Sequence, residues 1–109
     1  MADVLGTFEQ AVLLAILRLA DKAYGRAILQ EIEIRLEREV AAGAVHATLE
    51  RLENKGLVKS KLGSGTAIRS GRPRRYYRLE LSGVTALNDA RGTLEDLWRG
   101  LRWPLKGQI

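Results

Sequence analysis

The chain contains no cysteine, and it has only one histidine, one phenylalanine and two prolines among its 109 residues. Without cysteine there is no disulfide framework, no thiolate ligand for a metal and no thiol nucleophile. His46 stands alone, and no serine, histidine and aspartate set or cluster of carboxylates accompanies it. We therefore expect neither catalysis nor metal binding at His46, and we predict that the protein is not an enzyme and uses no cofactor.

Long apolar runs are also missing. The longest uninterrupted run is Ala11–Leu17, whereas a membrane span needs about 20 such residues. The N-terminus shows no basic region followed by a cleavage site, so we expect no signal peptide and take the cytoplasm as the location. A hydrophobic fraction of 46% with 28% charged residues is typical of a soluble globular domain, and 109 residues fit a single one.

Positive charge is unevenly distributed, because its whole excess lies in residues 57–81. This stretch reads LVKSKL, GSGTAIRSGRP and RRYYRLEL, which is an alternating strand, a glycine-rich loop and a second alternating strand, the pattern of a β-hairpin. It holds seven lysines and arginines against the single acid Glu80, a net charge of +6, while the whole chain carries +5. The hairpin therefore predicts a polyanionic partner. The alternative is a solvated edge ribbon whose charges keep it soluble.

Two neighbouring tyrosines of the second strand must point to opposite faces of the hairpin. Tyr77 is in line with Leu79 and Leu81, so we expect it to pack on the core. Tyr76 then faces outward, where it either touches a sugar-phosphate backbone or is simply exposed.

Two helices are predicted at the start of the chain, over residues 7–20 and 24–37, from apolar residues at spacings of three and four. Apolar residues extend almost all round the first helix, which predicts that it is central to the core. Thr7 and Gln10 stand three residues apart and form a candidate capping box that would set its start.

A third helix is predicted over residues 42–55. Val45, Leu49 and Leu52 form its buried stripe, and Gly56 is its natural left-handed stop. Its start is weakly specified, because no strong polar cap precedes it. The residues that the stripe turns outward, with His46 on the flank, are Gly43, Ala47, Glu50, Arg51 and Asn54.

A fourth helix is predicted after the hairpin, with Ser82 as its cap and Pro104 as its end. Leucines and an alanine recur in it at spacings of three and four, as in a coiled-coil seam, with Trp98 beside them. These seam residues are Leu87, Ala90, Leu94, Leu97 and Leu101. They could simply cover the domain of a monomer, but the other helices already satisfy each other, so we favour a homodimer joined through this seam.

Two helices joined by a short turn and followed by a basic hairpin are the arrangement of a winged helix-turn-helix. The predicted fold class is thus mainly α with a small antiparallel β-hairpin (α+β). Residues 1–81 would form the DNA-binding domain and residues 82–109 the dimerisation helix and tail, in one compact domain overall. The third helix would lie in the major groove, and the hairpin, or wing, would press its arginines on phosphates or into the minor groove.

The sequence also resembles a known family. The segments LGTFEQAVLLAILRLADKAYGRAILQEI, GAVHATLERLENKGLVKS and GRPRRYYRLELSGVTAL are similar to the PadR family of bacterial transcriptional regulators, in its compact form with a single C-terminal helix. The resemblance covers nearly the whole chain. It implies a winged-helix repressor that dimerises through that helix and responds to small molecules, commonly phenolic compounds or drugs. One residue departs from the family pattern, since His46 stands where a tyrosine is usual in the recognition helix.

Carried over residue by residue, the resemblance places the DNA-reading helix on Gly43 to Asn54 and the wing on Ser64 to Arg75. The hairpin residues expected to bind DNA, with the two lysines at the base of the wing, are Lys59, Lys61, Arg69, Arg72, Arg74 and Arg75. Trp98 and its symmetry mate would line a cleft for a flat aromatic effector. The alternative for Trp98 is packing alone.

The resulting expectation is a sequence-specific regulator that binds double-stranded DNA, with the family resemblance implying a ligand-responsive repressor. It would act as a homodimer on a pseudo-palindromic operator. The alternative is a winged-helix interaction module whose basic wing binds an acidic protein. An affinity for duplex DNA that falls steeply with salt distinguishes the first from the second.

Overall fold

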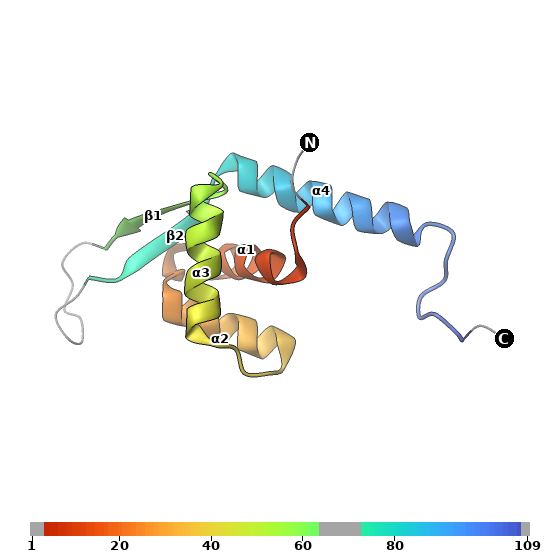
Figure 1. The fold of residues 1–109 in the computed structure, drawn as a ribbon, viewed down its shortest axis with the longest axis horizontal. Helices are drawn as coiled ribbons and strands as arrows, with labels where there is room; N and C mark the ends of the chain where they lie inside the picture. The colour runs from red at the N-terminus through yellow and green to blue at the C-terminus, as the bar shows by residue number, and fades with distance from the viewer. Residues whose placement is uncertain (1–3, 64–72, 108–109) are drawn as a thin grey trace.

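The computed structural model describes residues 4–63 and 73–107. Within these residues, four α-helices are combined with one antiparallel two-stranded hairpin, which confirms the predicted fold class (Figure 1). The elements are, in order, α1 (Thr7–Leu19), a short 3₁₀ helix η1 (Ala20–Lys22), α2 (Gly25–Leu36), α3 (Ala42–Asn54), β1 (Val58–Leu62), β2 (Arg75–Leu79) and α4 (Leu81–Trp98). The hairpin projects from one side of the body formed by α1, α2 and α3, and α4 extends away on the other (Figure 1). None of the helices described here is long and apolar enough to span a membrane.

The core lies where α1 packs against α2 and α3. Its buried side chains recur mainly at spacings of three and four along each helix, so each helix turns one apolar side to a shared interior. They include Val12, Leu13 and Ile16 of α1, Ile28 and Ile32 of α2, and Val45, Leu49 and Leu52 of α3. The predicted stripe of α3 is thus confirmed. The prediction that α1 is central to the core is confirmed, because it packs against α2, α3 and β2, although Leu14 and Leu17 are 46% and 50% exposed.

The capping box predicted for Thr7 and Gln10 does not form, so that prediction is wrong. Gly6 occupies the N-cap position of α1, and the carboxylate of Glu9 turns back to accept its N–H at 3.1 Å. Glu9 therefore satisfies a backbone donor at the start of the helix. The glutamate lies one residue before Gln10, so the box is shifted by one position along the chain.

The structure at both ends of α3 agrees with what its sequence predicts. Ala41 at the N-cap position supplies no side-chain cap, which confirms the weakly specified start. At the other end the chain turns at Gly56, whose φ of +78° lies in the left-handed region that favours glycine. Between α2 and α3, the carboxylate of Glu33 accepts the N–H of Val40 at 3.0 Å and fixes the turn.

The hairpin pairs β1 with β2 so that Val58 lies opposite Leu79 and Ser60 opposite Tyr77. Val58 is buried, and Tyr77 and Leu79 pack against the core, so this face of the hairpin lies on the helices. The prediction for Tyr77 is confirmed. The pleat sends the alternating residues to the opposite face, namely Lys59, Lys61, Tyr76 and Arg78.

The start of α4 is in close contact with the base of the hairpin. Ser82 does not cap the helix as predicted, because its hydroxyl donates to the carbonyl of Gly56 at 2.6 Å. Gly83 is buried against the chain that enters β1: a Cβ at this position would lie 2.3 Å from the carbonyl oxygen of Leu57. The missing side chain is what allows α4 to approach so closely.

α4 ends earlier than its sequence predicts. Its last helical residue is Trp98, and Gly100, with a φ of +86°, turns the chain before Pro104 is reached. Leu101 therefore lies beyond the helix, and it does not continue the seam predicted along α4.

Candidate nucleic-acid interface

The outward face of α3 is open to solvent. The residues predicted to read DNA from this helix are all exposed, namely Gly43, His46, Ala47, Glu50, Arg51 and Asn54. The buried stripe on the opposite side of the helix holds them outward. Since the major groove of B-DNA admits an α-helix, α3 presents a surface that can enter it.

An open cleft of about 570 Å³ lies beside the first half of α3, between the N-terminus of α2 and the start of β2. It brings His46 of α3 together with Arg74 and Arg75, which were predicted to bind DNA from the wing. Arg26 of α2 also lines it. The first residues of α2, whose start no side chain caps, and three arginines line the same cleft. Such a combination suits phosphate groups.

Arg26 was missed at the sequence level. It is the second residue of α2, where the positive end of the helix dipole disfavours a cation. A cation in that position raises a positive potential that a bound anion would offset. The unfavourable placement of Arg26 at the helix start is therefore the sequence feature from which a contact with an anion could have been predicted.

Arg51 is tied to the body of the protein. Its guanidinium lies 3.2 Å from the carboxylate of Glu9 in α1, and the ammonium of Lys55 lies 3.2 Å from the same oxygen. Arg51 also donates to the hydroxyl of Thr48 at 3.4 Å. Glu9 is only 8% exposed, and it fixes the end of α3 on α1. Sequence reasoning missed this carboxylate, because its partners lie 42 and 46 residues further along the chain.

The surroundings of Glu9 change its pKa. Burial alone raises the pKa of this carboxyl group, but the N–H of Gly6 and the cations of Arg51 and Lys55 stabilise the carboxylate, and the net pKa of Glu9 is lowered. Glu9 is therefore ionised at neutral pH and offsets part of the charge of Arg51. Elsewhere, burial raises the pKa of Tyr77 on the core side of the hairpin.

Of the two arginines that begin the second arm of the hairpin, Arg75 is held by the hairpin itself. Its guanidinium donates to the hydroxyl of Ser60 at 3.0 Å, and this hydroxyl donates to the carboxylate of Glu53 at 2.7 Å. The chain of hydrogen bonds links the wing to α3. It also fixes the orientation of Arg75 beside α3.

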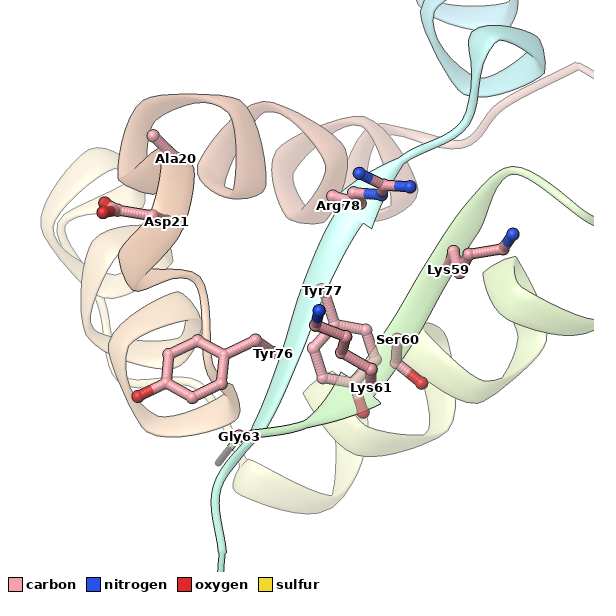
Figure 2. Close-up of a pocket in the computed structure, with 9 residues that line it drawn as sticks. All are labelled: Ala20, Asp21, Lys59, Ser60, Lys61, Gly63, Tyr76, Tyr77 and Arg78. Carbon is pink, nitrogen blue, oxygen red and sulfur yellow. The ribbon is translucent and has the colours of Figure 1, made fainter. Parts of the chain in front are cut away.

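Three further cations of the hairpin lie on the face away from α3. Figure 2 shows Lys59, Lys61 and Arg78 there, with Tyr76, around a hollow of about 490 Å³ between the hairpin and η1. The structure thus separates these two lysines from the arginines of the cleft, although the sequence grouped them as one wing.

Some predicted residues are not covered by the structure. Arg69 and Arg72 lie outside the described residues, as does most of the predicted wing from Ser64 onward. Within residues 4–63 and 73–107, no group of three or more histidine, aspartate or glutamate side chains could hold a metal ion.

The seam predicted on α4 is largely uncovered in the single chain. Leu87 packs against the core, and Ala90 is half-buried. Leu94 and Leu97, in the second half of the helix, are 54% and 71% exposed. Trp98, predicted to line an effector cleft, is half-buried in the last turn. α4 therefore carries an apolar strip outward from the body.

Comparison with known proteins decides the family. The profile of the transcriptional regulator PadR-like family matches residues 13–89, from α1 into α4. The chain belongs to the PadR-like family. Membership implies DNA-binding regulation, and PadR-like proteins are transcription factors rather than enzymes. The resemblance seen in the sequence is thereby confirmed.

Three solved structures share the fold of this PadR-like chain. A PadR-like transcription factor from Bacteroides fragilis is 28% identical, with a TM-score of 0.68 over 84% of this chain and 84% of that chain. RosR of H. salinarum is 27% identical, with a TM-score of 0.70 over 94% of this chain and 84% of that chain. A PadR family regulator from Eggerthella lenta is 27% identical, with a TM-score of 0.64 over 83% and 76% of the two chains. No curated protein sequence matches.

Proposed function

We propose that this PadR-like protein is a ligand-responsive repressor that binds a pseudo-palindromic operator as a two-fold dimer. The observation that carries the proposal is the cleft where Arg26, Arg74, Arg75 and His46 meet beside the exposed face of α3. Phosphates bound there would set the position of the protein on the duplex, and α3 would read base edges. The two half-sites would lie about one helical turn apart, or a multiple of it.

The exposed residues of α3 form two groups, one beside the cleft and one further along the helix. Gly43, His46 and Ala47 lie in its first half and are assigned to the first base pairs, with Glu50 and Asn54 further along the groove. Arg51 contributes less, because it shares its charge with a carboxylate. Residues 1–81 thus form the DNA-binding part, and residues 82–109 contain the dimerisation helix.

DNA binding is expected to weaken steeply as salt is added. Each neutralised phosphate contributes about −0.9 to the slope of log affinity against log salt. Arg26→Gln removes one cation from the cleft, so we expect it to reduce the magnitude of that slope by about 1. Fluorescence anisotropy measures the slope on a duplex that the wild-type protein selects from a random-sequence pool.

Arg91→Gln is the matched control, because it removes one highly exposed cation from α4, away from the cleft. Its slope should equal that of the wild type. A wild-type slope in Arg26→Gln as well would contradict the assignment of the cleft to phosphate binding.

The effector site is tested through Trp98. Flat aromatic compounds are expected to change tryptophan fluorescence and to release the protein from DNA, because a ligand between the two α4 helices would alter the separation of the recognition helices. Trp98→Ala should abolish the release and keep salt-dependent DNA binding. Trp103→Phe is the control for the second indole, which is 80% exposed. Release that persists in Trp98→Ala would place the effector elsewhere.

A further inference from the structure

Three side chains are stacked where the second arm of the wing meets the start of α2. The guanidinium carbon of Arg74 lies 4.1 Å from the centroid of the Tyr24 ring. The same ring meets Tyr76 edge to face, with a centroid separation of 5.7 Å and an interplanar angle of 68°. Tyr24 is therefore the middle member of the stack, between a cation and a second ring.

The backbone holds the members of this stack in place. Tyr24 and Tyr76 form an isolated antiparallel bridge, and the N–H of Tyr77 donates to the carbonyl of Ala23 at 2.9 Å. The strand β2 is thus joined on its free edge to the residues just before α2. Tyr24 is also the N-cap residue of α2, so the stack and the helix start share one residue.

Tyr76 is confined from the other side by Gly63. A Cβ on Gly63 would lie 2.8 Å from the Tyr76 ring, and the N–H of Gly63 donates to the carbonyl of Arg74 at 2.7 Å. Figure 2 shows the Tyr76 ring pointing from the strand toward the helices, with Gly63 beside it. Tyr76 is therefore not simply exposed, because it packs between Gly63 and Tyr24 and is half-buried, while its contact with the DNA backbone stays a prediction.

The stack leaves the hydrogen-bonding capacity of Arg74 intact. A guanidinium group that lies over a ring uses its flat face, whereas its five N–H donors point outward in its own plane. Arg74 forms no ion pair with the part of the chain that the structure describes. Arg75 beside it is already bound to the Ser60 hydroxyl. Arg74 is thus a positioned cation with free donors, next to the uncapped start of α2.

We propose that Tyr24 is a positioning residue for DNA binding, which holds the Arg74 guanidinium beside the N-terminus of α2 so that both address the same phosphate. The inference rests on the proposed function and adds to it how the wing is aligned with the recognition helix. The ring acts through Arg74, and its own hydroxyl makes no hydrogen bond within the described residues.

A double-mutant cycle tests this role on the full chain, with the duplex selected by the wild-type protein. Tyr24→Leu is expected to weaken binding about fivefold and to reduce the magnitude of the salt slope by up to about 1, because Arg74 loses its platform. Tyr24→Phe keeps the ring and should bind within about twofold of the wild type. In the Arg74→Ala background, Tyr24→Leu should bring no further loss.

The control variant Leu36→Ala distinguishes a loss of protein stability from a loss of the Arg74 position. This substitution removes a partly buried side chain at the far end of α2, and it should lower the urea midpoint without changing the salt slope. If Tyr24→Phe binds as poorly as Tyr24→Leu, the hydroxyl contacts DNA directly and the positioning role is wrong. If the losses of affinity from Tyr24→Leu and Arg74→Ala add in the double variant, the positioning role is also wrong. Salt-dependent DNA binding by the wild type would in that case still support the proposed function. A wild-type protein that does not bind duplex DNA overturns both.

Discussion

Replacing Leu94 and Leu97 together by glutamate is expected to turn the proposed dimer into a monomer and to lower operator affinity by about 10²–10⁴-fold. The two leucines are 54% and 71% exposed in the single chain, and burying the exposed part of each against a partner would contribute about 1–2 kcal/mol. A monomer binds one half-site only, so it loses the effective concentration that links the two halves. Light scattering after gel filtration measures the mass, and anisotropy measures the affinity.

A charge-matched variant separates this effect from simple repulsion of DNA. Asn88→Glu with Arg91→Gln also lowers the charge of α4 by two units, at exposed positions that are not among the predicted seam residues. It should remain a dimer and lose little affinity. A Leu94→Glu, Leu97→Glu protein that still has the mass of a dimer would show that α4 is not the seam.

Glu9→Gln is expected to destabilise the fold by about 1–3 kcal/mol at neutral pH. The carboxylate of Glu9 is nearly buried and contacts Arg51, Lys55 and the N–H of Gly6. The amide keeps the shape but removes the charge, so two cations at the end of α3 lose their counterion. Both cations reach solvent, at 50% and 30% exposed side chain, which keeps the effect below that of a fully buried pair. Urea titration at neutral pH measures the difference.

The direction of the pKa shift sets the pH dependence of this effect. Because the pKa of Glu9 is lowered in the folded protein, the folded state binds the proton less tightly than the unfolded chain does. The stabilisation is therefore fully present above the unfolded pKa of about 4.3, and it is lost as the pH falls through the folded value. The difference between the wild type and Glu9→Gln should shrink in acid. A difference that is the same at neutral and acid pH would contradict the ion-pair role, and Glu39→Gln, at an exposed site, is the control.

The elements of the fold were predictable because each one has its own local pattern. The stripe of Val45, Leu49 and Leu52 defined the buried side of α3, and the same spacing left the residues of the predicted DNA-reading face exposed. The alternation of the hairpin likewise placed Tyr77 on the core. Patterns of this kind depend on residues a few positions apart, which a sequence displays directly.

One error at a helix end arose because a tertiary contact competed with a local one, and another because a local stop signal was passed over. Ser82 had the residue type of a cap, but its hydroxyl finds the carbonyl of Gly56, 26 residues earlier. Gly100 was visible in the sequence as a stop for α4, and weighting it above Pro104 would have removed Leu101 from the seam. Helix ends depend on such single contacts more than helix interiors do.

The sequence predicted the separate surfaces of the candidate site but not the side-chain contacts that join them. The sequence indicated the reading face of α3 and the arginines of the wing, whereas the contacts of Glu9 with α3 and of Tyr24 with Arg74 join segments far apart along the chain. No spacing rule relates such residues. Strand alternation implied that Arg75 lies on the opposite face of the hairpin from Lys59 and Lys61, but it did not predict that Arg74 joins Arg75 at the cleft beside α3.

Through the close contact at Gly83, a movement at the far end of α4 would be transmitted to the hairpin. Because this glycine lies against Leu57 at the entrance to β1, we expect the helix and the base of the wing to turn together. From Gly83 to Trp98 the helix rises about 22 Å, so a shift of about 2 Å at Trp98 corresponds to a rotation of about 5° at the hairpin. In the proposed dimer, a compound inserted between the far ends of the two α4 helices would need to displace each helix end by only this distance to tilt both proposed recognition helices on the duplex.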